Sequence, residues 1–256
     1  MPFLIAGRTL TIAGNVRNLV HLKINAPAPA TRWLGRTTNV TKIPAGLLEH
    51  YTQASRMELD LEGKLADRAY PILASLVTPR PIAWVTTLGP DGVVNAAPFS
   101  FFNLLGANPP ILGFCPGDRE DGTPKDTARN IRLNHEFVVN LVDEKLAQAM
   151  NRTAAPLPYG VSELTSAGLT TAPSSSIKVP RIAEAPASLE CTEWGTLQIG
   201  GNRLIIGLIK RVQVRDELFD AKTLRIRSEL LHVIGRMASP NWYCRAQDRF
   251  EMIRPD

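Results

Sequence analysis

The sequence is short of several features that mark particular protein classes. It has three cysteines, Cys115, Cys191 and Cys244, in no CxxC spacing, and its four histidines are scattered. An odd cysteine count without such a spacing favours reduced thiols in a cytoplasmic protein over a disulfide framework or a zinc site. No apolar run approaches the length needed to cross a bilayer. We therefore expect a cytoplasmic protein that binds neither a metal nor a membrane.

Two motifs of common enzyme classes are also missing. There is no GxSxG, and no histidine is evidently placed beside a serine or cysteine nucleophile. No GxGxxG follows a strand-like run, so a Rossmann nucleotide site is not indicated. These absences argue against nucleophilic catalysis by a side chain.

Acidic residues are scarce at the start of the chain. Residues 1–56 hold 7 Lys/Arg and 1 Glu, whereas the remainder holds 22 basic and 23 acidic residues. The net charge of +5 therefore arises in the leading segment, and the body offers no electrostatic reason to bind nucleic acid. A flexible basic tail, a targeting peptide and a segment preceding a natural start at Met57 remain open. We expect a basic, disordered or non-native extension over 1–56 and one domain over 57–256.

The most informative stretch is 78–103, TPRPIAWVTTLGPDGVVNAAPFSFFN. Its apolar, β-branched run at 82–88 predicts a buried strand, and Gly89-Pro90-Asp91-Gly92 predicts a tight turn into a second strand. Pro98 has no N–H, so we expect it to interrupt the second strand. The polar groups left unpaired there need partners, which a ligand could supply.

The remaining chain predicts more strands than helices. Hydrophobic spacing predicts helices within 57–77, at 125–134 with Asp126 or Thr127 as the cap, and at 143–152. It predicts strands at 111–115 and 137–142, and a hairpin of 187–199 with 203–215. Turn residues predict a loop at 104–110, and 153–183 is expected to be a linker, a lid or a subunit-contact segment. Six or seven strands joined mostly by hairpins favour an antiparallel barrel with peripheral helices.

Two places offer binding chemistry. Lys125-Asp126-Thr127 opens a helix, so backbone N–H groups, a lysine and a hydroxyl converge as a phosphate subsite would require, and Arg80 could add a planar fork. The alternative is an ordinary helix start with a solvated lysine. The run from Pro98 to Phe102 could hold a flat heteroaromatic ring by backbone hydrogen bonds, or it could be an aromatic core at a strand end.

From Met57 to about Tyr243 the chain resembles the flavin reductase-like FMN-binding split-barrel family, which includes nitrilotriacetate monooxygenase component B-type reductases and flavoredoxin. The resemblance rests on TPRPIAWVTT (78–87), DGVVNAAPFSFFN (91–103), NPPI (108–111), KDTARNI (125–131), EFVVNLV (136–142), AGLTTAPS (167–174) and PRIAEAPASLEC (180–191). It implies a mainly β fold with peripheral helices, a Greek-key split β-barrel. It also implies a homodimer with FMN near the interface, FAD being the alternative flavin.

The resemblance also implies roles for particular residues. Residues lining the isoalloxazine ring would be Ala97, Pro98, Phe99, Ser100 and Phe101, residues holding the phosphate would be Lys125 and Thr127 with Arg80 assisting, and second choices are Thr78, Asn95 and Asn103. No side chain is expected to be catalytic, because the cofactor carries the hydride transfer. The C-terminal stretch departs from the family pattern, which leaves open which of its residues reach the flavin.

The implied activity is reduction of flavin by NAD(P)H, with reduced FMN supplied to a partner monooxygenase. A tight FMN-binding electron carrier without nicotinamide chemistry is the first alternative. A haem-type or other non-catalytic ligand-binding module on the same barrel is the second.

Overall fold

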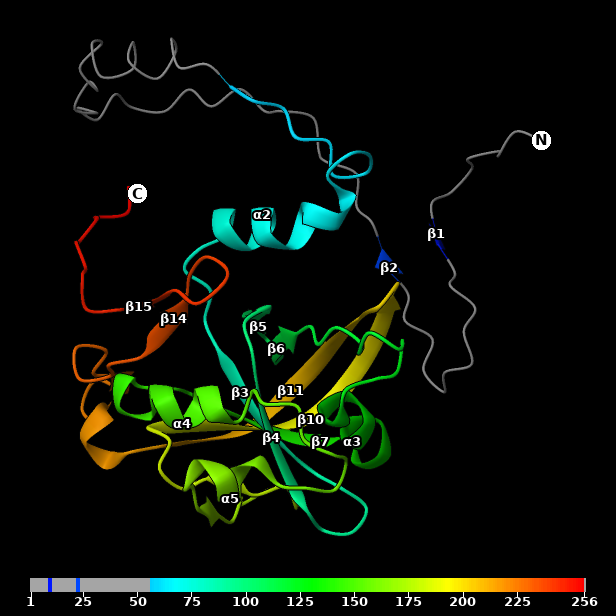
Figure 1. The fold of residues 1–256 in the computed structure, drawn as a ribbon. Coiled ribbons are helices and arrows are strands. Elements are labelled where there is room, and N and C mark those ends of the chain that lie inside the picture. Colours follow the sequence, from blue (N-terminus) through cyan, green and yellow to red (C-terminus); the bar gives the residue numbers. More distant parts are fainter. Residues whose placement is uncertain (1–8, 11–21, 24–55, 256) are drawn as a thin grey trace. The chain divides into compact units, whose positions relative to one another are not determined.

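The computed structural model describes residues 9–10, 22–23 and 56–255. The chain divides into two units, Met1–Glu58 and Leu59–Asp256. In the first unit, β1 (Thr9–Leu10) pairs with β2 (Leu22–Lys23) in antiparallel fashion. The rest of the predicted extension over 1–56 lies almost wholly outside the described residues, so its character stays a prediction. Figure 1 labels the main helices and strands of the second unit, which the following paragraphs describe.

One antiparallel sheet of seven strands, in the order β4-β3-β7-β10-β11-β6-β5, forms the centre of the second unit. Its strands are β3 (Ala83–Leu88), β4 (Val94–Phe99), β5 (Phe102–Ala107), β6 (Pro110–Phe114), β7 (Glu136–Asn140), β10 (Ala187–Ile199) and β11 (Asn202–Val214). Three two-stranded sheets accompany it, formed by β8 (Thr171–Ala172) with β9 (Arg181–Ile182), β12 (Phe219–Asp220) with β13 (Arg225–Ile226), and β14 (Ile234–Arg236) with β15 (Tyr243–Arg245). The helices are α2 (Ala69–Leu76), α3 (Asp126–Asn134), α4 (Ala147–Arg152) and α5 (Glu163–Ala167), with 3₁₀ turns at Ala66–Arg68, Glu144–Leu146 and Asp216–Leu218.

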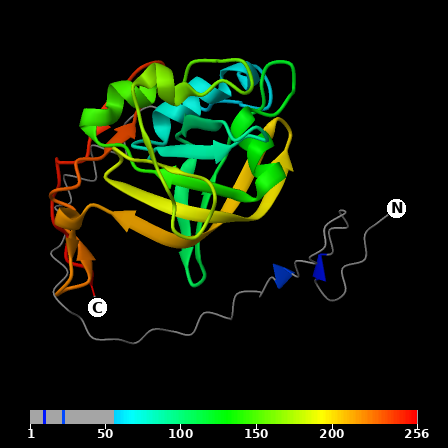
Figure 2. The same cartoon turned by 90° about the horizontal axis from the view of Figure 1, so that it is seen from below.

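The strand order forces this sheet to curl. β4 and β5 lie at opposite edges, yet only Ser100 and Phe101 separate them in the chain. Three Cα–Cα steps span at most about 11 Å, whereas six strand spacings of a flat sheet would require about 29 Å. The edges are therefore brought together at Ser100 without a ladder between β4 and β5 among the described residues. This is a split β-barrel, mainly β with peripheral helices, which confirms the predicted fold class; Figure 2 shows the long β10–β11 ribbon crossing it.

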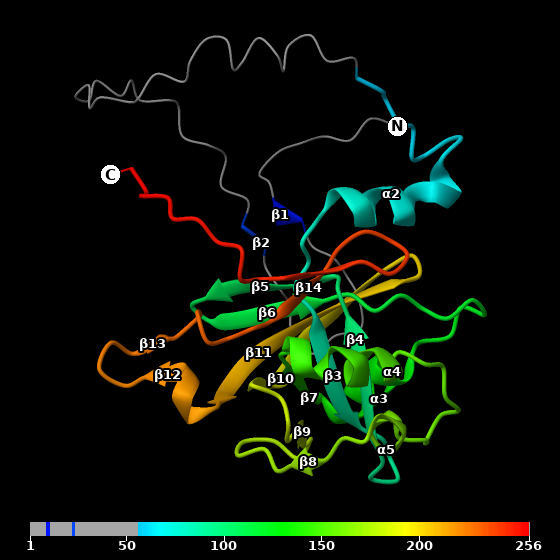
Figure 3. The ribbon, with the colours of Figure 1, turned by 60° about the vertical axis from the view of Figure 1, so that its left-hand side comes forward.

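Both faces of β3 are buried, in keeping with its apolar and β-branched sequence. Ala83 and Val85 point into the barrel interior, where Phe114 and Phe137 pack edge to face. Trp84 points to the other face, into a second cluster with Ile82, Met150, Leu164 and Ile234 among others. Figure 3 shows α3, α4 and α5 around β3 and β4. α4 and α5 add Met150 and Leu164 to the cluster around Trp84, whereas α3 adds Ala128 and Ile131 to the interior cluster.

Pro98 does not interrupt its strand, contrary to expectation. It lies opposite Trp84 within β4, and β4 is an edge strand with a neighbour on one side only. Main-chain groups of residues 94, 96 and 98 turn to the open side, as shown by Val94 O accepting from Ser162 Oγ and Ala96 N donating to Glu163. A missing N–H at Pro98 therefore costs no ladder bond.

Three further expectations are corrected. Residues 104–107 belong to strand β5 instead of a loop, and the turn is confined to Asn108 and Pro109. The N-cap of α3 is Lys125, whose side chain makes no capping bond, so neither Asp126 nor Thr127 caps it. The predicted helix over 143–152 is a 3₁₀ turn capped by Asp143 followed by α4.

The segment 153–183 is neither a plain linker nor structureless, since it contains α5, β8 and β9. Both strands of the predicted hairpin over 187–215 are present as β10 and β11. Within the part of the chain that the structure describes, no helix is long and apolar enough to cross a membrane.

Candidate functional site

Two cavities adjoin at the end of β4, and Pro98, Phe99 and Ala154 line both. The first, of about 740 Å³, lies between α4 and the β14–β15 hairpin and is called the hairpin cavity. The second, of about 660 Å³, lies at the start of α3 and is called the helix cavity. Because they share a wall, an elongated ligand could extend from one into the other.

The helix cavity carries groups suited to an anion. Lys125 and Thr127 line it, and no side chain caps the first N–H groups of α3, which carry the positive end of the helix dipole. Thr127 is 1% exposed and its Oγ1 lies 3.1 Å from Asn95 Nδ2. Lys125 Nζ lies 5.8 Å from the centre of the Phe99 ring. The ammonium group is therefore beside the wall that the two cavities share.

Five carboxylates also line the helix cavity, and two of them form ion pairs with arginines. Asp126 pairs with Arg119 at 2.6 Å, and Asp118 pairs with Arg203 at 2.7 Å. Glu163 of α5 is instead a buried carboxyl whose Oε2 accepts from Ala96 N at 2.9 Å. Burial raises the pKa of Glu163 above its ordinary value, although the Ala96 hydrogen bond partly offsets the shift.

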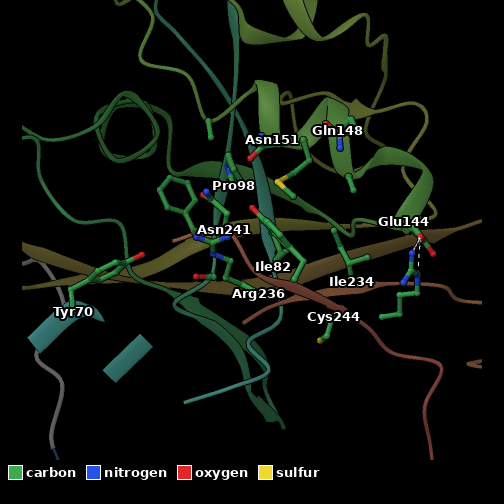
Figure 4. A pocket seen from close by; sticks show the side chains of 17 residues that line it. Tyr70, Ile82, Pro98, Glu144, Gln148, Asn151, Ile234, Arg236, Asn241 and Cys244 are labelled. Atoms are coloured by element: carbon green, nitrogen blue, oxygen red, sulfur yellow. Dashed lines mark hydrogen bonds and ion pairs between the residues drawn. The ribbon is translucent and has the colours of Figure 1, made fainter. Parts of the chain in front are cut away.

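The hairpin cavity is framed by polar side chains from two distant parts of the chain. Figure 4 shows Gln148 and Asn151 of α4 on one side, Arg236 and Asn241 on the other, and Pro98 between them. The Arg236 guanidinium stacks over the ring of Tyr243 with its carbon 4.7 Å from the ring centre. Such a surface can receive a flat ring and hydrogen-bond to its edge.

Arg80 explains how the C-terminal hairpin reaches this place. Its backbone N and O pair with Arg236 O and N at 2.9 and 2.8 Å. Its buried guanidinium donates to the carbonyls of Ala74, Val77 and Met237, and Nε lies 3.3 Å from Ser100 Oγ. These bonds engage the guanidinium, and Arg80 does not line the helix cavity with Lys125 and Thr127, so its help in holding a phosphate stays a prediction.

The structure brings together seven of the eleven residues that the sequence proposed as flavin ligands. Those lining one or both cavities are Asn95, Ala97, Pro98, Phe99, Ser100, Lys125 and Thr127. The other four, Thr78, Arg80, Phe101 and Asn103, line neither cavity. Phe101 is 42% exposed beside Tyr70, with ring centres 6.1 Å apart, and the Oδ1 of exposed Asn103 accepts from its neighbour's amide.

Sequence reasoning missed the polar residues on the far walls. Gln148 and Asn151 were counted as part of a helix, and Glu163 fell in a segment read as a linker or lid. For Arg236 and Asn241 the only signal was the departure of the C-terminal stretch from the family pattern. Their contribution depends on pairing with Arg80, which no local pattern reveals.

Comparison with known proteins gives consistent results. The family model described as the flavin reductase-like domain matches residues 75–239. An uncharacterised protein of Deinococcus radiodurans is 41% identical over 205 residues, which cover 78% of this chain and 90% of that protein.

Solved structures with the same fold include proteins of related description. Nitrilotriacetate monooxygenase component B from Bacillus cereus is 35% identical with a TM-score of 0.74, covering 78% of this chain and 100% of that one. The 2-nitrobenzoate 2-nitroreductase of Pseudomonas fluorescens is 35% identical with a TM-score of 0.71, covering 78% and 96%. A structure with a split barrel domain from Shewanella frigidimarina, 20% identical with a TM-score of 0.67 and covering 78% and 100%, supports the fold alone.

Proposed function

The chain belongs to the flavin reductase-like family, and from this premise we propose that it binds FMN across the two adjoining cavities and reduces it with NAD(P)H. The observation that carries the proposal is the shared wall at Pro98 and Phe99. This wall joins the helix cavity, whose N–H, ammonium and hydroxyl groups can bind an anion, to the hairpin cavity, which contains the stacked Arg236 and amide side chains. A ligand with a phosphate at one end and a flat ring at the other matches that sequence of surfaces.

The donor set of the helix cavity fits the phosphate. Lys125 supplies a charge, Thr127 a buried hydroxyl, and the uncapped start of α3 supplies N–H groups. These groups bind and orient the phosphate end, while the paired carboxylates of Asp118 and Asp126 have their charge balanced by arginines. FAD would fit this donor set only if its pyrophosphate lay in the helix cavity. We therefore propose FMN as the flavin.

The ring end lies at the seam of the barrel. Ser100 lines the hairpin cavity, and its Oγ lies within hydrogen-bonding distance of Arg80 Nε. If Arg80 donates to that oxygen, the hydroxyl proton of Ser100 is free to point at a ring heteroatom. Gln148 and Asn151 offer amide groups from the opposite wall. These side chains would hold the ring in one plane and exclude water from one of its faces.

When bound, the flavin would supply the redox chemistry, as the acceptor of a hydride from NAD(P)H. The chain's part is to orient two rings and limit access of water. No acid–base pair of side chains is required for this role, in keeping with the expectation that no residue is catalytic in its own right.

A homodimer is part of the proposal. Exposed apolar side chains occur at the end of α2 and on edge strand β5: Leu76 is 70% exposed, Val77 62%, Leu104 61% and Leu105 50%. Phe101, between β4 and β5, is also exposed and lies beside Tyr70. A second copy packing here would cover this surface close to the flavin.

The partner is proposed to be a monooxygenase that uses the reduced FMN. Support comes from the relative described as nitrilotriacetate monooxygenase component B. The free state of all three cysteines supports a cytoplasmic location.

Anaerobic spectroscopy tests the proposal. Purified protein is mixed with FMN, and NADH or NADPH is added without oxygen while the flavin absorbance is followed. Bleaching by either nucleotide, faster than with free FMN, is expected. Retained flavin that neither nucleotide bleaches would favour the electron carrier, and a Soret band would favour a haem module.

A nitroreductase is the second candidate, because the Pseudomonas fluorescens relative is as similar in sequence as component B. In that case the hairpin cavity would also admit a nitroaromatic acid. Repeating the bleaching assay and then adding 2-nitrobenzoate anaerobically separates the two. Rapid reoxidation of the flavin by the nitro compound would indicate nitroreduction, whereas reoxidation by oxygen alone would support the reductase.

A further inference from the structure

Two arginines at the hairpin cavity have no carboxylate partner among the residues that the structure describes. Arg236 lines the cavity, and Arg80 lies next to it, with Nε 3.3 Å from the Oγ of the lining residue Ser100. Neither takes part in an ion pair within the described part of the chain. Their main chains pair with each other at 2.9 and 2.8 Å. The fold therefore fixes two positive charges side by side at this cavity.

The side chain of Arg80 is buried without a countercharge. Arg80 is 5% exposed, and its guanidinium donates only to uncharged acceptors, the carbonyls of Ala74, Val77 and Met237 and the hydroxyl of Ser100. These acceptors satisfy its N–H groups but do not neutralise its charge. A buried charge in a protein is ordinarily paired with an opposite one. An anion bound in the cavity beyond Ser100 would supply it.

Arg236 presents its charge to the cavity itself, as Figure 4 shows. The guanidinium stacks on the Tyr243 ring, with its carbon 4.7 Å from the ring centre, and donates to the carbonyl of Pro240. Both contacts are with uncharged groups of the β14–β15 hairpin. They hold the cation at the cavity wall and leave its charge available to a ligand.

The other charged side chains that line the hairpin cavity neutralise each other. Glu144 and Arg245 both line it, and Arg245 Nε lies 2.7 Å from Glu144 Oε1. Lys125 belongs to the helix cavity, where the phosphate is proposed to bind. The described lining of the hairpin cavity therefore carries one net positive charge, from Arg236, and the charge of Arg80 lies close behind it.

Reduction of a flavin creates the negative charge that this cavity favours. The oxidised ring is neutral, and a hydride carries two electrons and one proton. A ring that accepts a hydride from NAD(P)H therefore gains a single negative charge, while NAD(P)H becomes NAD(P)⁺ and no further reactant is needed. Charges fixed in advance favour the state in which the opposite charge develops.

We propose that Arg236 stabilises the anionic, reduced form of the flavin ring, and that Arg80 is a positioning residue that assists it through Ser100. The inference rests on the proposed function, which assigns the ring to the hairpin cavity. It goes further, because it predicts that this cavity discriminates between the two redox states of one cofactor.

The predicted discrimination appears as a difference between two dissociation constants. Screened as at a protein surface, a unit charge acting over about 8 Å changes an equilibrium constant by tenfold or more. Arg236→Gln should therefore weaken reduced FMN by about tenfold. Oxidised FMN, whose ring is neutral, should be weakened by less than about threefold. The ratio of the two constants fixes the two-electron midpoint potential, which should fall by about 30 mV for a tenfold change.

Two measurements without a pyridine nucleotide test this. The midpoint potential of bound FMN is read anaerobically against a dye of known potential. The dissociation constant of sulfite is read from the loss of flavin absorbance, because sulfite adds to the oxidised ring and leaves a negative charge on it. In Arg236→Gln the sulfite constant should rise by about tenfold. Arg236→Lys keeps the charge and should recover most of the wild-type values.

Two further variants complete the test. Arg152→Gln is the matched control, because Arg152 ends α4, is exposed and lines neither cavity. Its sulfite constant should stay within about twofold of the wild type, since solvent screens an exposed charge. Ser100→Ala removes the hydroxyl between Arg80 and the cavity and leaves the carbonyl bonds of Arg80 in place. It should reduce the preference for reduced over oxidised FMN by about threefold.

An unchanged sulfite constant and potential in Arg236→Gln, or equal weakening of oxidised and reduced FMN, would overturn the inference alone. So would a loss in Arg236→Lys or Arg152→Gln as large as in Arg236→Gln, because the charge at this wall would then not be the cause. Failure of the wild type to bind FMN would instead refute the proposed function, and the inference with it.

Discussion

Replacing Glu190 with glutamine is expected to destabilise the domain by about 3 kcal/mol. Glu190 is fully buried on β10, yet its carboxylate receives hydrogen bonds from Ser175 N at 2.9 Å, Ser176 N at 2.8 Å, Ser176 Oγ at 2.6 Å and Gln213 Nε2 at 2.6 Å. In glutamine an NH₂ group replaces one carboxylate oxygen, and an NH₂ group cannot accept the two hydrogen bonds that this oxygen receives. At least two bonds to a charged acceptor are therefore lost, each worth roughly 1.5 kcal/mol or more.

The loss of stability caused by Glu190→Gln is expected to depend on pH. Burial alone would raise the pKa of Glu190, but hydrogen bonds from Ser176, Ser175 and Gln213 outweigh it and lower the pKa from 4.5 to about 2. Because the pKa is lower in the folded state, the stabilisation is complete above pH 4.5 and is lost as the pH falls toward 2. The difference between wild type and Glu190→Gln should therefore shrink in acid.

Thermal unfolding followed by circular dichroism at pH 7 and pH 3 measures both effects. For a domain of this size, about 3 kcal/mol corresponds to a fall in Tm of roughly 6–12 °C at pH 7. Glu229→Gln, which changes an exposed carboxylate, is the control and should leave Tm within about 1 °C. A Tm unchanged at pH 7, or a gap that widens at pH 3, would refute the account of the Glu190 cluster.

Three further outcomes are expected. Arg80→Lys should lower stability by about 3 kcal/mol in chemical denaturation, because lysine cannot reproduce a planar fork bonded to three carbonyls; an unchanged midpoint would contradict this. Leu104→Glu should convert a dimer to a monomer by light scattering after gel filtration, and a wild-type monomer would remove the proposed interface. Burial raises the pKa of Cys191, so an aromatic disulfide should modify Cys115 and Cys244 in native protein long before Cys191; equal rates would contradict the burial.

Local patterns sufficed for the hairpins but not for the cavity walls. The β3–β4 and β10–β11 hairpins follow from alternation and turn residues, and the fold class follows from their number. β5 was missed because Asn108-Pro109-Pro110 after Leu104 resembles a long loop, whereas a cross-strand neighbour, β6, orders the residues before it. Tertiary pairing outweighed local propensity there.

In the candidate site, too, some residues can be predicted from local sequence patterns and others cannot. Lys125 and Ser100 are found from a helix start and a strand end, which are local signals. A guanidinium suits a phosphate and a set of carbonyls equally well, so the sequence alone does not show that Arg80 donates to carbonyls after α2 and in the C-terminal hairpin. Glu163 depends on the open edge of β4, which a sequence does not display.

The most direct test of the central claim is the loss of affinity for FMN, compared with riboflavin, in the double variant Lys125→Ala/Thr127→Ala. Only FMN carries a phosphate, so removal of two charge-assisted hydrogen bonds should weaken FMN by about 100-fold. Riboflavin binding, which depends on the walls around Pro98 and Ser100, should change less than about threefold. Equal losses for the two flavins, or no loss for either, would contradict the placement of FMN across the two cavities.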